Sequence, residues 1–160
     1  MNIAIIPARA GSKRIPNKNI KKFKGKPIFL WPLIAAQKTN LFDKIILSTD
    51  SEKIAKIGRK YKMDVPFLRP QNISDDHAST SSVISHAIRW LRNNNMKPKL
   101  VCCIYPTAAY LNSKDLITGY KKIKKKKWDY VFSGGKFNSS IFRSFRKNKL
   151  NGLKMLFSKY

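Results

Sequence analysis

The sequence predicts an α/β fold in which a mostly parallel sheet is flanked by helices. Short apolar runs, typical of buried strands, alternate along the chain with longer segments that carry helix caps or an apolar stripe. A strand, a helix and the next strand form a right-handed crossover, which makes the strands parallel and places helices on the sheet faces. The 160 residues are enough for one domain, 1–160, with a buried core.

Strands and helices alternate in the first part of the chain. Asn2–Pro7 is an apolar run that ends in proline and predicts a buried strand, whereas Ala8–Asn19 after it is a polar loop rich in cations. Ile28–Lys38 has helical spacing, with its proline in the first turn, where the missing N–H costs little. Lys44–Thr49 predicts a second buried strand, and Glu52–Tyr61 predicts a second helix.

The alternation continues to residue 133. Val65–Leu68 is short and extended, and its proline limits it to an edge or a loop. Ser79–Asn94 predicts a helix with a serine or threonine cap and an apolar stripe. Leu100–Tyr105 predicts a third buried strand, stopped by a proline. Ser113–Lys126 predicts a helix that begins at a cap-like serine, and Tyr130–Ser133 predicts a fourth strand.

The last part of the chain has a weaker pattern. Phe142–Arg146 and Leu153–Phe157 could form a hairpin around Asn151-Gly152. Residues 130–160 contain neither aspartate nor glutamate. No group in this segment therefore offers the hard carboxylate oxygens that Mg²⁺ prefers.

The chain is strongly basic. It carries 34 Lys and Arg against 8 Asp and Glu, a formal net charge of +26. This charge raises the possibility of a nucleic-acid-binding module, but the aromatic residues do not interleave with cations as in single-strand binders. A compositional bias of the gene would give the same charge, and an anionic substrate would be attracted in either case. The run Lys121–Lys127 is expected on the solvent face of a helix and its end.

Two features bear on the cellular compartment. No apolar run approaches the roughly 20 residues that span a bilayer, and Met1–Ala8 lacks the basic start of a signal peptide. We therefore expect no membrane association and a cytoplasmic location. Cys102 and Cys103 are adjacent in a predicted strand and point to opposite faces, so they are expected as two small buried hydrophobic residues and not as a disulfide.

The loop after the first strand carries the strongest sign of chemistry. Residues 7–19 read PARAGSKRIPNKN and include the cations Arg9, Lys13, Arg14 and Lys18. Gly11 lets the backbone approach a ligand closely, and backbone amides together with lysines can surround a triphosphate. The sequence matches neither the common phosphate loop nor the dinucleotide fingerprint. The alternative interpretation is a basic surface loop in a basic protein.

A second string of polar residues precedes the helix predicted at Ser79. Asp75-Asp76-His77 could suggest a metal site, but adjacent side chains on a loop rarely converge on one ion. We favour a role in starting the helix for these residues.

The N-terminal loop closely resembles the signature loop of the cytidylyltransferases that activate sialic acids and related nonulosonic acids. The loop departs from the family at Ala10, where its members typically carry glycine. Three further segments resemble the family and occur in the same order: Ser48-Thr49-Asp50, Pro66–Pro70 followed by Ser74–Asp76, and Tyr105-Pro106-Thr107. The tyrosine form, within CCIYPTA, looks most like the pseudaminic acid branch of the family. The resemblance covers essentially the whole chain.

The resemblance implies a fold, a reaction and a set of site residues. The fold would be of the nucleotide-diphospho-sugar transferase type (GT-A, Rossmann-like). The reaction would transfer CMP from CTP to a nonulosonic acid and release pyrophosphate, with Mg²⁺ as cofactor. Contacts to the triphosphate or support of its loop are implied for Arg9, Gly11, Ser12, Lys13, Lys18 and Asn19, with Lys13 and Arg9 as the catalytic pair. Contacts to the cytidine or the sugar are implied for Arg69, Ala78, Thr80, Tyr105, Pro106 and Thr107.

The same resemblance implies further parts. Family members continue beyond the region matched here and carry an aspartate pair for the metal and a segment for dimerisation and sugar binding. We therefore expect a nucleotidyltransferase domain that lacks the family's C-terminal part, with the metal ligands unassigned and a homodimer for full-length members. The alternative functions are a catalytically impaired fragment that keeps nucleotide binding, or a basic nucleic-acid-binding module.

Overall fold

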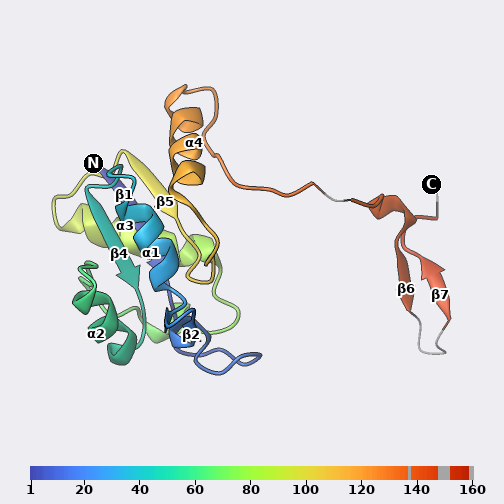
Figure 1. Cartoon of the computed structure of the whole chain (residues 1–160), viewed down its shortest axis with the longest axis horizontal. Coiled ribbons are helices and arrows are strands. Elements are labelled where there is room, and N and C mark those ends of the chain that lie inside the picture. The colour runs from blue at the N-terminus through green and yellow to red at the C-terminus, as the bar shows by residue number, and fades with distance from the viewer. Residues whose placement is uncertain (137, 148–151, 159–160) are drawn as a thin grey trace.

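The computed structural model describes residues 1–136, 138–147 and 152–158. Its centre is a parallel sheet of three strands in the order β4-β1-β5. β1 (Asn2–Pro7) lies between β4 (Lys44–Ser48) and β5 (Leu100–Cys103), as Figure 1 shows. Ile5 is in register with Ile46 on one side and Cys103 on the other. The predicted parallel α/β fold is confirmed.

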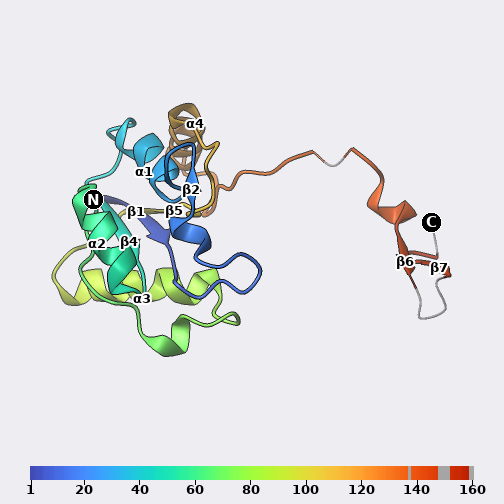
Figure 2. The same ribbon diagram turned by 60° about the horizontal axis from the view of Figure 1, so that its bottom comes forward.

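Helices cover both faces of this sheet. Alternate side chains of β1 separate the core into two clusters, because successive strand residues point to opposite faces. Ala4 and Ile6 pack with α1 (Leu30–Gln37) and α2 (Glu52–Lys60). Ile3 and Ile5 pack with α3 (Thr80–Asn93). In Figure 2, α3 and α1 lie on opposite sides of the strands, and α4 (Ser113–Lys124) lies beside α1.

The helices begin at short polar side chains. The Ser51 side chain accepts a hydrogen bond from the Ile54 amide, and that of Ser79 accepts one from the Ser82 amide. At α4 the expected cap was wrong by one residue. Asn112, not Ser113, has the extended backbone of an N-cap, and it forms a capping box with Asp115.

Short elements fill the connections. The 3-10 helix η1 (Lys18–Ile20) closes the N-terminal loop, and β2 (Lys22–Phe23) and β3 (Lys26–Pro27) form a small hairpin. The 3-10 helix η2 (Gln71–Ile73) precedes α3. The predicted segment Val65–Leu68 forms no strand of its own. It follows the outer edge of β4, where isolated bridges join Ile46 to Asp64 and Thr49 to Leu68.

The predicted fourth strand at residues 130–133 was wrong. These residues have no strand pairing, and the side chains of Tyr130 and Phe132 are 87% and 89% exposed. A short apolar run becomes a strand only when a neighbouring strand pairs with its backbone and a core covers its side chains. Among the described residues this segment has neither, since the chain leads away from the sheet here (Figure 1).

The C-terminal residues form the predicted antiparallel hairpin. After the 3-10 helix η3 (Ile141–Arg143), β6 (Phe145–Lys147) pairs with β7 (Leu153–Met155). The predicted turn at Asn151 lies outside the described residues. Figures 1 and 2 show the hairpin apart from the three-stranded sheet. None of the helices in the described part is both long and apolar enough to cross a bilayer.

The two cysteines are free and differ in burial. Cys102 is half-buried and packs against the core, as expected, but Cys103 is exposed. β5 is an edge strand of the described sheet, so the face that carries Cys103 is not covered as the apolar run predicted. The lysine run 121–127 is exposed except at Ile123, which confirms its place on the solvent side.

Candidate functional site

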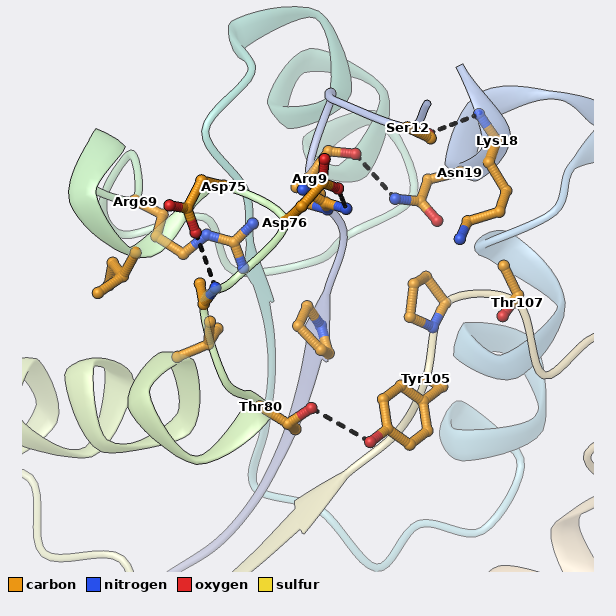
Figure 3. A pocket seen from close by; sticks show the side chains of 15 residues that line it. Arg9, Ser12, Lys18, Asn19, Arg69, Asp75, Asp76, Thr80, Tyr105 and Thr107 are labelled. Atoms are coloured by element: carbon orange, nitrogen blue, oxygen red, sulfur yellow. Dashed lines mark hydrogen bonds and ion pairs between the residues drawn. The ribbon is translucent and has the colours of Figure 1, made fainter. Parts of the chain in front are cut away.

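A cavity of about 190 Å³ opens at the carboxyl ends of β1 and β5 (Figure 3). Ligands of open parallel sheets bind at this edge, where loops rather than helices follow the strands. Three segments form its walls: the loop after β1, the segment that leads into α3, and the loop after β5. The lining residues are Pro7, Arg9, Ser12, Lys18, Asn19, Arg69, Ile73, Asp75, Asp76, Ala78, Thr80, Val83, Tyr105, Pro106 and Thr107.

The cavity brings together most of the residues that the sequence singled out. Ten of the twelve predicted binding residues line it; Gly11 and Lys13 do not. Gly11 is exposed, and an added Cβ there would meet nothing within 4 Å. The Lys13 side chain is 86% exposed, and its Nζ lies 2.8 Å from Oδ2 of Asp76, which lines the cavity. Five lining residues were not among the predicted site residues: Pro7, Ile73, Asp75, Asp76 and Val83. Asp75 and Asp76 belong to one of the family-like segments, but no contact to a ligand was assigned to them.

Hydrogen bonds from three sides hold the N-terminal loop in place. The Ala10 amide donates to Oδ1 of Asp50 over 2.8 Å, which ties the loop to the end of β4. The Lys18 amide donates to Oγ of Ser12 over 3.2 Å and closes the loop on itself. Buried Asn19 donates through Nδ2 to the Arg9 carbonyl over 2.8 Å. Oδ1 of Asp50 therefore supports the loop.

Asn19 also offers an unused acceptor to the cavity. Its side chain is buried, and its Oδ1 has no hydrogen-bond partner within the described residues. An orphaned buried acceptor is costly, and a donor such as a hydroxyl or an amino group would satisfy it. Phosphate oxygens are acceptors themselves, so this atom suits the nucleoside or sugar part of a ligand, while its Nδ2 organises the loop.

Asp76 forms the main ion pairs of the site. It bonds to Arg9, and its Oδ2 lies 2.8 Å from Nζ of Lys13. These two hydrogen bonds, Lys13 first, lower the pKa of Asp76 to about 2, and the same contact raises the pKa of Lys13. The carboxylate is therefore ionised throughout the neutral range.

The neighbouring Asp75 shapes the turn before α3. Its Oδ1 accepts hydrogen bonds from the amides of His77 at 3.0 Å and Ala78 at 2.7 Å. The polar string thus prepares the start of α3, as favoured from the sequence. No three His, Cys, Asp or Glu side chains in the described ranges are grouped to hold a metal ion.

Arg69 is the buried cation of the site. Its amide donates to the Thr49 carbonyl over 2.7 Å, and its Nε donates to Oγ of Ser74 over 3.1 Å. Ser74 in turn donates to the Pro70 carbonyl over 2.8 Å. Burial lowers the pKa of Arg69 from its ordinary value, although a guanidinium still remains charged at neutral pH.

The opposite wall joins α3 to the loop after β5. Oγ1 of Thr80, in the first turn of α3, lies 3.2 Å from Oη of Tyr105 (Figure 3). The N-terminus of this 14-residue helix carries a partial positive charge toward the cavity. Together with Arg9, Lys18 and Arg69 it makes the site suited to an anion despite the two carboxylates.

Comparison with known proteins identifies the family. A sequence model of the family described as cytidylyltransferase matches residues 3–154. The chain belongs to the cytidylyltransferase family. This cytidylyltransferase is 40% identical to the pseudaminic acid cytidylyltransferase of Campylobacter jejuni over 99% of its own length and 68% of that protein. It is 35% identical to a Helicobacter pylori protein over 99% of this chain and 30% of that protein. That protein is named pseudaminic acid cytidylyltransferase and UDP-2,4-diacetamido-2,4,6-trideoxy-beta-L-altropyranose hydrolase.

Solved structures share the fold. A CMP:2-keto-3-deoxy-manno-octonic acid synthetase complexed with CTP superimposes with a TM-score of 0.65 at 17% identity. The match covers 78% of this cytidylyltransferase and 47% of that chain. A 4-diphosphocytidyl-2C-methyl-D-erythritol synthase from Anaerococcus prevotii gives a TM-score of 0.63 at 15% identity, over 96% and 63% of the two chains. The expected nucleotidyltransferase type of fold is therefore confirmed.

Proposed function

We propose that this cytidylyltransferase transfers CMP from CTP to a nonulosonic acid, with pseudaminic acid as the substrate, and releases pyrophosphate. One observation carries the proposal. The residues of the family-like motifs, far apart in the sequence, surround one cavity at the carboxyl edge of the sheet, and pseudaminic acid cytidylyltransferases match nearly the whole chain. The substrates named for those relatives fit a cavity that combines cations with neutral hydrogen-bonding groups.

The proposed reaction is a substitution at phosphorus. The anomeric hydroxyl of the sugar attacks the α-phosphorus of CTP, a new O–P bond forms, and the bond to the pyrophosphate oxygen breaks. The protein positions the two reactants and offsets charge, as is usual for phosphoryl transfer. In this proposal Arg9, Lys13, Lys18 and the amides of the N-terminal loop contact the phosphates.

The other wall is proposed to recognise the nucleoside and the sugar. Arg69, Ala78 and Thr80 lie around the base, where the buried guanidinium can donate to a carbonyl oxygen of cytosine. Tyr105, Pro106 and Thr107 also line the cavity and are proposed to lie near the nucleotide or the sugar. The unused Oδ1 of Asn19 accepts from a hydroxyl or an amino group of the ligand.

Mg²⁺ is proposed as the cofactor because the family resemblance implies it. The carboxylates in the cavity do not form a metal centre by themselves, since Asp76 is paired with two cations and Asp75 accepts from two amides. We therefore derive no step through the ion. A cytoplasmic location and a homodimer are part of the same proposal. Exposed apolar side chains of the C-terminal hairpin, such as Leu153 at 70% exposure, are consistent with a partner subunit.

The proposal is tested by ligand-dependent melting and by turnover. At 100 times its dissociation constant, CTP with Mg²⁺ should raise the melting temperature by about 5 to 10 °C, and ATP, GTP and UTP should raise it less. Pyrophosphate release should then require pseudaminic acid and proceed more slowly with N-acetylneuraminic acid. Equal shifts from all four triphosphates would show that charge alone is recognised and would refute the choice of base.

A further inference from the structure

The cations expected to bind phosphate are already paired within the protein. Arg9 bonds to one oxygen of the Asp76 carboxylate, and Lys13 bonds to the other. Arg9 and Asp76 are 67 residues apart in the sequence. One carboxylate thus joins the two cations of the N-terminal loop to the segment that leads into α3, and it closes one side of the cavity (Figure 3).

Asp76 is the more firmly held member of this contact. The turn that carries it is fixed by the two hydrogen bonds to Asp75, and the cap of α3 at Ser79 follows directly. The Lys13 side chain is 86% exposed, so its ammonium can turn from Asp76 to a ligand without disturbing the packing of the loop. Arg9 lines the cavity together with Asp76, so a ligand bound there can reach its guanidinium.

A carboxylate in this position competes with a polyphosphate. Phosphate oxygens and carboxylate oxygens use the same donors of arginine and lysine. A ligand that is to gain Arg9 and Lys13 must first replace Asp76 on both of them. An uncharged ligand such as cytidine does not need Arg9 or Lys13, so its binding does not require the displacement of Asp76.

We propose that Asp76 is a competing internal anion, which the phosphates of the substrate displace from Arg9 and Lys13 and which recaptures them when pyrophosphate leaves. The inference rests on the proposed function and adds a residue that sets affinity for the polyphosphate part of the ligand. Its consequence for turnover is that Asp76 speeds the release of pyrophosphate and limits inhibition by this product. Because the pKa of Asp76 is about 2, the competitor stays charged at every pH at which the protein would act.

Calorimetric titration of the Asp76→Asn variant tests this inference. Without the charge of Asp76, CTP and inorganic pyrophosphate should bind about three- to tenfold more tightly, the range expected for two exposed ion pairs that no longer have to break. The affinity for cytidine should not change. Asp75→Asn is the matched control, since it removes a carboxylate charge from the same cavity, keeps the acceptor for the turn, and leaves the Arg9 and Lys13 pairs intact. Its gain should be smaller.

Three outcomes would overturn the inference: no gain in Asp76→Asn, weaker binding of CTP in this variant, or an equal gain in Asp75→Asn. Thermal unfolding checks that the variants fold, and Asp76→Ser replaces Asp76→Asn if the latter does not. Failure of the proposed function would give a different result from failure of this inference. The parent protein would then bind pyrophosphate but would not prefer CTP to other triphosphates. The pyrophosphate titrations would still decide the role of Asp76.

Discussion

Arg69 is expected to lower the free energy of unfolding and to strengthen the binding of CTP. The substitution Arg69→Met separates these two effects. The side chain is buried, 5% of the residue being exposed, and no carboxylate lies within ion-pair distance among the described residues. Of the five N–H groups of a guanidinium, one donates to Ser74. Burial lowers the pKa of Arg69, because its charge is less well solvated there than in water.

The expected change can be worked out from these contacts. Methionine has a similar length and no charge, and Ser74 keeps its hydrogen bond to the Pro70 carbonyl. Replacing a poorly compensated buried cation by an apolar side chain should raise the free energy of unfolding by about 1–2 kcal/mol. The loss of a charged hydrogen bond to the ligand should weaken CTP binding at least about tenfold, which corresponds to about 1.4 kcal/mol or more.

Urea unfolding and calorimetric titration of the same samples measure both quantities. Arg92→Met, on the exposed end of α3, is the control and should leave both nearly unchanged. A loss of stability in Arg69→Met would contradict the reasoning, because it would mean that Arg69 supports the fold through its packing. Unchanged CTP affinity would remove Arg69 from the binding site.

Three other predictions follow from particular contacts. Gly58→Ala should lower the free energy of unfolding by about 1–3 kcal/mol despite the better helix propensity of alanine, because the new Cβ would lie 2.4 Å from Cδ2 of the buried Leu47; an unchanged urea midpoint would show that Leu47 can move aside. Burial raises the pKa of the Cys102 thiol from 9.0 to about 11. The contribution of the neutral thiol to stability is therefore complete below pH 9 and is lost as pH rises through 11. Unfolding curves taken across that range should show this loss in the parent protein and not in Cys102→Ala. Lys13→Ala should lower turnover by on the order of 10²-fold, whereas Lys125→Ala in the exposed lysine run should change it little; similar losses from both would mean that only bulk charge matters.

The local pattern of the chain was sufficient to predict most of the fold. The apolar run of β1 alternates Ile3 and Ile5 with Ala4 and Ile6, and both sets are buried because helices cover both faces. The serine before α3 marked the start of that helix, since a cap needs only its own next three residues. The hairpin of β6 and β7 likewise depends on neighbours in the sequence.

The wrong predictions concern residues whose strand pairing or burial depends on distant parts of the chain. Residues 130–133 have the apolar, β-forming side chains of a strand, but no strand edge pairs with them among the described residues. Cys103 belongs to a run that looks buried throughout, but it lies on an edge strand and is exposed. Burial and strand pairing are properties of the neighbours in space, which local patterns do not name.

In the candidate site, too, some features could be predicted from the sequence and others depend on contacts between distant residues. The motif in the N-terminal loop and its family resemblance were enough to point to ten of the cavity's lining residues, because their chemistry is written in residue type and order. The sequence alone determined the parallel α/β plan, the cationic loop and the family. Only the tertiary structure decided that Asp76 pairs with both Arg9 and Lys13. An ion pair between residues 67 positions apart forms when the sheet brings two loops to one edge, and nothing in either loop specifies its partner beforehand.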